Sequence, residues 1–209
     1  LQADAWFNMP HRADDDYIRQ FATYVRDNLN PDLKAYIEYS NETWNSQFEQ
    51  AHYVIEQGKA LGLSDNDFQA GLFYHSHRAG EIFAIWEDVF GGTDRLVRVL
   101  ASQGANSWTG EQVLTYNAMY EHADALAIAP YFGGYLGDPS TIEDVLALGV
   151  DGVLDASLAH IQGEVRGWIS DNLRVTSQYG VELIAYEGGQ HLTGYAGAEN
   201  DDRLTELFI

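Results

Sequence analysis

Two glutamates, Glu42 and Glu187, stand directly after predicted β-strands and could act together on a sugar. Glu42 follows the run Lys34–Tyr39, and Glu187 ends the apolar run Val181–Tyr186. Active sites of strand–helix barrels lie at the carboxyl ends of the strands, so we expect both carboxylates at one mouth. Hydrolysis of a glycosidic bond needs one carboxyl group as proton donor and a second, ionised one as nucleophile. The pair therefore indicates glycoside chemistry.

The residues around each glutamate leave a simpler interpretation open. Ser40 or Asn41 could cap a helix, with Glu42 in its first turn, where negative charge is favourable. Glu187 could be a surface residue before a glycine turn. However, each carboxylate has an aromatic residue beside it, Trp44 near Glu42 and Tyr186 before Glu187. Aromatic rings offer apolar platforms to sugar rings. Taken together, the two segments favour the catalytic interpretation.

Short apolar runs alternate with segments of helical period, which predicts an α/β fold with a parallel sheet. The predicted strands are Ala3–Met9, Lys34–Tyr39, Leu96–Leu100, Ala125–Pro130 and Val181–Tyr186. A long helix is expected from a capping box at Ser64 and Asp67 to Gly91-Gly92. Another helix is expected to bury one amphipathic face. That face consists of Leu154, Leu158, Ile161, Val165, Ile169 and Leu173.

Asn41-Glu42 after one strand, with a glutamate ending a strand three strands later, resembles the clan A glycoside hydrolases. These are retaining enzymes with a (β/α)8 TIM barrel, in which the acid/base glutamate follows an asparagine on strand four and the nucleophile ends strand seven. The resemblance covers nearly the whole chain. It implies an incomplete barrel of about five strand–helix units, strands three to seven, in a single domain over residues 1–209 that is truncated at both ends.

The resemblance implies roles for four residues. Glu42 matches the acid/base, Glu187 the nucleophile and Asn41 the residue that binds the sugar 2-hydroxyl. Tyr131 lies just after the sixth barrel strand, where a tyrosine or histidine contacts the nucleophile. The absence of strands one and eight, which supply further substrate contacts, places the activity of this chain in question.

Other side chains on or just after predicted strands are expected to contact sugar. They are Trp6, Asn8, His11, Trp44, Trp108 and His191. His11 and His191 could equally be surface residues, and Trp108 could pack onto a helix. No metal site or cofactor is predicted: His75 and His77 do not share a helix face, and no glycine-rich phosphate loop follows a strand.

Composition restricts the class of partner. The chain has 32 acidic and 11 basic residues, a net charge of −21, which disfavours nucleic acid. No apolar stretch approaches the roughly 20 residues of a membrane span, and the absence of cysteine excludes disulfides and thiolate chemistry. The predicted location is extracellular or secreted. The exposed edges of a partial barrel favour oligomerisation by strand pairing.

The leading hypothesis is a retaining glycoside hydrolase acting on a β-linked polysaccharide or oligosaccharide. The alternative is a non-catalytic carbohydrate-binding barrel, disfavoured because a pure binder has no reason to keep an acid and a nucleophile together. A third reading is a different enzyme on an open doubly wound sheet, which strand order would distinguish.

Overall fold

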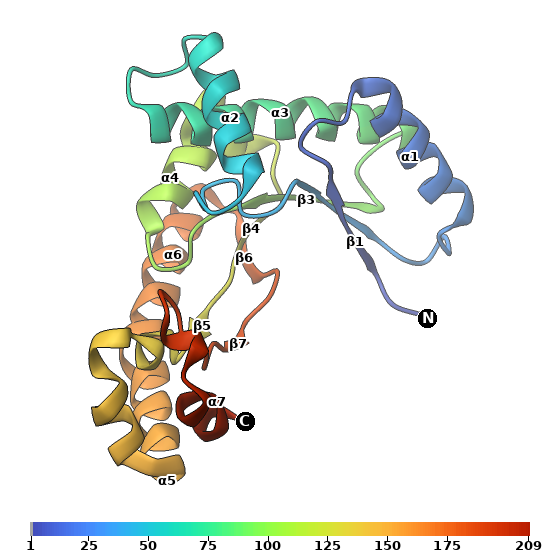
Figure 1. Cartoon of the computed structure of the whole chain (residues 1–209). Coiled ribbons are helices and arrows are strands. Elements are labelled where there is room, and N and C mark those ends of the chain that lie inside the picture. The colour runs from blue at the N-terminus through green and yellow to red at the C-terminus, as the bar shows by residue number, and fades with distance from the viewer. Residues whose placement is uncertain (1) are drawn as a thin grey trace. The chain divides into compact units, whose positions relative to one another are not determined.

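The computed structural model describes residues 2–209 and contains a five-stranded sheet in the order β1-β2-β3-β4-β6 (Figure 1). Its strands are β1 (Ala5–Met9), β2 (Ala35–Tyr39), β3 (Leu96–Ala101), β4 (Ala125–Ile128) and β6 (Glu182–Ala185). The pairs β1–β2, β2–β3 and β3–β4 are parallel. Each predicted strand is confirmed, and sheet order follows chain order, as is common for successive strand–helix–strand crossovers. The fold is α/β.

Helices separate the strands along the chain. Their bounds are α1 (Asp15–Asn28), α2 (Glu49–Ala60), α3 (Asp67–Phe90), α4 (Ser107–Thr115), α5 (Ile142–His160), α6 (Arg166–Tyr179) and α7 (Asp202–Phe208). Short helical turns cover 116–121, 134–137, 139–141, 161–165 and 198–200, and β5 (Tyr131–Phe132) pairs with β7 (Gly189–Gln190).

The predicted capping box of the long helix is wrong in its residues. Asn66 is the N-cap of α3, and its side chain accepts a hydrogen bond from the backbone N–H of Gln69 at 2.9 Å. Ser64 instead bonds the side chain of Gln69 at 2.6 Å. Asn is as good a cap as Ser, and here it stands directly before the first helical residue. The other end is as expected, because Gly91 adopts φ +75° and stops the helix.

The chain divides into two compact units, each with its own core. The first unit comprises residues up to Ile128 together with Asn172–Ile184, and the second comprises Ala129–Asp171 and Ala185–Ile209. In the first unit, α1 and α3 pack against the sheet around Ile18, Ile37, Leu72, Phe83 and Trp86. The second unit has a smaller core of Leu136, Val145, Val153, Ala198 and Leu204.

Gly58 allows α2 and α3 to approach each other closely. A Cβ atom at this position would lie 2.1 Å from the carbonyl oxygen of Ala70 on α3. Such a distance is far inside van der Waals contact, so only glycine fits.

The predicted amphipathic face of the α5–α6 segment is mostly exposed, which contradicts its expected burial. Leu154 and Leu158 are 58% and 51% exposed, whereas Val153 and Ser157 are buried. Residues Ile161–Val165 form a π-helical turn between the two helices. Predicted face residues are exposed on both sides of this turn, Leu154 and Leu158 before it and Ile169 and Leu173 after it. A period of 3.6 residues shows which side chains share a face but not whether another element covers that face. Among the predicted face residues, Val165 is buried.

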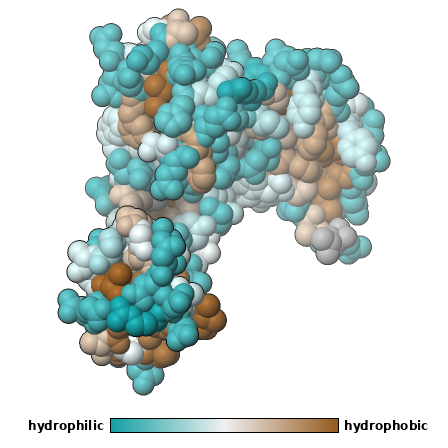
Figure 2. All heavy atoms as spheres, in the orientation of Figure 1, coloured by the Kyte–Doolittle hydropathy of each residue, from teal (hydrophilic) through white to brown (hydrophobic). Residues whose placement is uncertain are grey.

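Hydrophilic residues cover most of the surface seen in Figure 2, and hydrophobic residues reach it in separate areas, in keeping with the net charge of −21. Within residues 2–209, none of the helices has the length and apolar character to cross a membrane.

Candidate active site

The turn after β2, residues 40–45, carries two non-glycine residues in the left-handed backbone region. Ser40 has φ +61° and Glu42 has φ +46°. Left-handed backbone at a residue with a Cβ atom costs on the order of 1–2 kcal/mol and persists only where the surroundings enforce it. We call this segment the β2 turn. Glu42, the predicted acid, therefore sits on a strained backbone at the carboxyl end of a sheet strand.

Neighbouring elements hold the backbone of the β2 turn. The N–H of Ser40 donates to the carbonyl of Met9 at 2.8 Å, and the Nδ2 of Asn8 donates to the carbonyl of Ser40 at 2.6 Å. From α2, the Nε2 of Gln50 donates to the carbonyl of Asn41 at 2.8 Å. Contacts from β1 and α2 thus enforce the unusual backbone.

Helix α3 contacts the β2 turn through the side chain of His75. The Oγ1 of Thr43 lies 3.0 Å from the Nδ1 of His75, and both residues are buried. Burial lowers the pKa of His75 to about 4 because the charged imidazolium would lose its hydration. His75 is therefore a neutral anchor at physiological pH.

Glu42 is half-buried, and its Oε2 accepts a hydrogen bond from the Nδ2 of Asn45 at 2.9 Å. The N–H of Asn45 donates to the carbonyl of Glu42 at 2.9 Å, so the two residues are tied at both backbone and side chain. The carboxyl group is thereby held in one orientation rather than left to rotate.

Glu38 is a buried carboxylate at this site that the sequence reasoning missed. It is 1% exposed, and its Oε2 accepts hydrogen bonds from Trp6 Nε1 at 2.8 Å and from Asn8 Nδ2 at 3.0 Å. Side chains alternate along a strand, so Glu38 lies on the opposite face from Ile37, which packs under the helices. The available signal was a charged residue at the centre of an otherwise apolar strand.

Two predicted sugar contacts, Trp6 and Asn8, are therefore brought together. Both lie on β1, whose register places Trp6 opposite Tyr36 and Asn8 opposite Glu38. The rings of Trp6 and Tyr36 stack at 5.2 Å between centroids. An aromatic pair beside hydrogen-bonding side chains is suited to a sugar ring.

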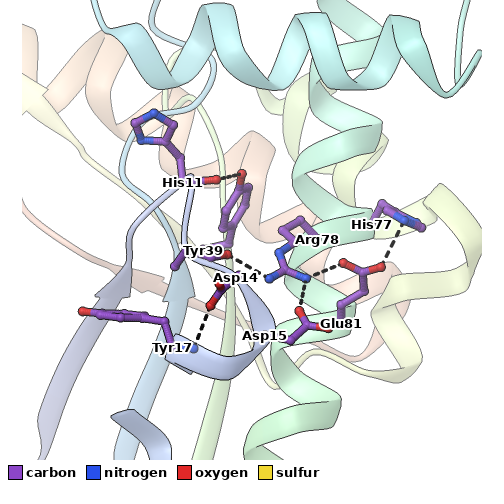
Figure 3. A network of polar contacts seen from close by, with 9 residues as sticks. His11, Asp14, Asp15, Tyr17, Tyr39, His77, Arg78 and Glu81 are labelled. Carbon is purple, nitrogen blue, oxygen red and sulfur yellow. Dashed lines mark hydrogen bonds and ion pairs between the residues drawn. The ribbon is translucent and has the colours of Figure 1, made fainter. Parts of the chain in front are cut away.

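His11 belongs to the loop between β1 and α1, which a polar network holds (Figure 3). Tyr39 donates to the carbonyl of His11 at 3.0 Å, and Arg78 of α3 pairs with Asp15 at 2.8 Å. Burial raises the pKa of Tyr39, so its hydroxyl stays protonated and donates. The half-buried ring of His11 packs against Tyr53 of α2 at 5.2 Å. The network fixes the loop backbone.

The other two tryptophans predicted to contact sugar lie in different surroundings. Trp108, on α4, stacks on Phe68 of α3 at 6.3 Å and is 41% exposed. This packing agrees with the alternative reading of a tryptophan on a helix, with part of the ring left accessible. Trp44 is half-buried and packs against the core of the first unit.

The second unit holds Glu187, Tyr131 and His191. Tyr131 of β5 pairs with Gly189 of β7, and the rings of Tyr131 and His191 lie 5.5 Å apart. Glu187 is exposed and lies between β6 and β7, two residues before Gly189. The pairing of β5 with β7 therefore brings Tyr131 and His191 together. Glu187, the predicted nucleophile, lies in the short segment of chain just before β7.

Residues 2–209 contain no group of three or more His, Asp and Glu side chains that could hold a metal ion. Comparison with protein-family models found no match, and neither did comparison with curated proteins or with solved structures.

Proposed function

We propose that the protein is a retaining glycoside hydrolase acting on a β-linked polysaccharide or oligosaccharide. The observation that carries the proposal is the β2 turn, where half-buried Glu42 occupies a left-handed backbone held by contacts from β1, α2 and α3. Strained residues that persist at a strand end are typical of active sites. The five-stranded parallel sheet is then part of a (β/α)8 barrel, with its mouth at the carboxyl ends of the strands.

The proposed reaction is a double displacement. Glu42 donates its proton to the glycosidic oxygen while a carboxylate oxygen of Glu187 attacks the anomeric carbon, so the bond to the leaving group breaks as the glycosyl–enzyme ester forms. Glu42, now ionised, takes a proton from water, whose oxygen attacks the same carbon and releases Glu187. Two inversions give net retention. Asn41 binds the sugar 2-hydroxyl, and Asn45 orients the carboxyl group of Glu42.

Azide rescue tests the two roles separately. Wild-type protein should hydrolyse a 2,4-dinitrophenyl β-glycoside with retention. On this substrate Glu187→Ala should lower kcat/KM at least 100-fold, whereas Glu42→Ala should lower kcat at least 100-fold because its glycosyl–enzyme ester accumulates without a base. Azide should restore turnover in both, forming the β-glycosyl azide with Glu42→Ala and the α-glycosyl azide with Glu187→Ala. Glu56→Ala and Glu206→Ala, at exposed helical positions, are the controls.

Two outcomes would contradict the proposal. Inversion of configuration by the wild-type protein would exclude a covalent intermediate. Binding of glycan without hydrolysis would favour the non-catalytic carbohydrate-binding alternative, for which the partly exposed ring of Trp108 offers a platform.

A further inference from the structure

Asn8 has only one orientation of its amide that satisfies its neighbours. Its Nδ2 lies 3.0 Å from the carboxylate of Glu38 and 2.6 Å from the carbonyl of Ser40. A backbone carbonyl can only accept a hydrogen bond. The Nδ2 must therefore face Ser40, which settles the orientation that an amide side chain otherwise leaves open, and the same orientation brings the Nδ2 to Glu38.

This orientation uses both N–H bonds of Asn8 and leaves its Oδ1 as an acceptor. The side chain is exposed although its two partners, Glu38 and Ser40, are buried. The side chain thus joins a buried carboxylate to the accessible surface beside the β2 turn. An acceptor held there suits a hydroxyl group, which can donate its proton.

We propose that Glu38 is a positioning residue for the acid Glu42, and that it acts through Asn8. Glu38 fixes Asn8, Asn8 holds the carbonyl of left-handed Ser40, and the β2 turn carries Glu42 two residues later. The Oδ1 of Asn8 accepts a hydrogen bond from a hydroxyl of the bound sugar. This inference rests on the proposed glycosidase function and adds to it a buried residue that touches neither the substrate nor the reacting atoms.

Two donors converge on one buried oxygen of Glu38, the Nε1 of Trp6 at 2.8 Å and the Nδ2 of Asn8 at 3.0 Å, so this oxygen fixes the Asn8 side chain. Glutamine at this position keeps one acceptor oxygen but replaces the other with an NH2 group, whereas leucine removes both acceptors. The hydrogen bond that holds Asn8 should therefore be weakened in Glu38→Gln and lost in Glu38→Leu.

A misplaced acid has a kinetic signature that general loss of structure does not produce. Phenol is a poor leaving group that needs a proton, whereas 2,4-dinitrophenolate leaves without one. For Glu38→Gln and Asn8→Ala, kcat/KM should fall at least tenfold on the phenyl β-glycoside and less than threefold on the dinitrophenyl β-glycoside of the same sugar. Glu56→Gln, on an exposed helical position, should change neither.

NMR of the Asn8 side-chain amide provides a readout independent of catalysis. In the wild-type protein its two protons should give separate, slowly exchanging signals, and Glu38→Gln should shift them and Glu38→Leu should speed their exchange. Equal kinetic losses on both glycosides, or amide signals unaffected by either substitution, would overturn the inference. A wild-type protein inactive on both glycosides overturns the proposed function and with it the catalytic role of Glu38, whereas the amide signals still report whether the Asn8 contact forms.

Discussion

The Oγ1 of Thr43 and the Nδ1 of His75 lie 3.0 Å apart in the buried interior of the first unit. Thr43 follows Glu42 directly in the chain, so the predicted acid is tied to helix α3 by its neighbour. The Nε2 of His75 is buried without a hydrogen-bond partner among the described residues. Protonation would place an uncompensated charge there.

His75 should therefore make stability depend on pH. Its pKa is about 4 in the folded protein, against an ordinary value of 6.5. Between these values the unfolded chain takes up a proton that the folded chain does not, so stability is complete above pH 6.5 and falls toward pH 4, by up to about 3 kcal/mol. His75→Leu should flatten this part of the curve in urea titrations. The exposed His52→Leu should not, and an equal slope in wild-type and His75→Leu proteins would refute the assignment.

Strain at Glu42 predicts an unusual response to glycine. Because φ is +46°, Glu42→Gly should relieve backbone strain and leave the free energy of unfolding unchanged or raised by about 1 kcal/mol, while removing the carboxyl group proposed as the acid. In contrast, Glu56→Gly in the exposed interior of α2 should cost about 1 kcal/mol. Chemical denaturation of the two variants measures the difference. A loss at Glu42 as large as that at Glu56 would mean that its backbone is not strained in solution.

Neighbouring apolar residues of α5 should differ sharply in their contribution to stability. Val153 is buried in the core of the second unit, so Val153→Ala should cost about 1–3 kcal/mol. Leu154 is 58% exposed, and Leu154→Ser should change stability by less than about 1 kcal/mol. Thermal melts of both variants provide the comparison. A larger loss for Leu154 would show that its face is covered in solution.

Gly58 should tolerate no side chain. Gly58→Ala places a Cβ atom against the carbonyl oxygen of Ala70 and must push α2 away from α3. We expect a loss of at least about 1–3 kcal/mol, the range found for overpacked cores. Gly62→Ala, just beyond α2, meets open space but adopts φ +66°, so its cost should be limited to about 1 kcal/mol of backbone strain. A melting temperature unchanged in Gly58→Ala would contradict the observed packing.

Local signals in the sequence were sufficient for the strands and for the end of the long helix. β-branched and apolar runs ending in glycine, proline or polar clusters predicted all strands of the main sheet. The central strands β2, β3 and β4 are largely buried, whereas β1 and β6 are partly exposed. Gly91 likewise predicted the end of α3, because a left-handed C-cap favours glycine and depends only on the local backbone. The exposed face of α5–α6 was missed because a period of 3.6 residues shows which side chains share a face but not whether another element covers that face.

The predicted site could be reached only in part from sequence. Glu42 and its neighbours were predicted because a polar cluster follows a strand directly. Glu38 was missed because its partners, Trp6 and Asn8, lie on another strand 30 or more residues away, and only the register of β1 on β2 brings them together. The left-handed backbone of Ser40 was missed for the same reason, since contacts from distant segments enforce it.

Covalent trapping tests the central claim most directly, namely that Glu187 is the nucleophile that acts with Glu42. The protein is incubated with a 2-deoxy-2-fluoro glycosyl fluoride of the β-configuration, digested and analysed by mass spectrometry. A fluorosugar adduct on Glu187 in the wild-type protein, absent from Glu187→Gln, is the predicted result. A label on another carboxylate, or hydrolysis of glycosides that persists unchanged in Glu187→Gln, would contradict the account.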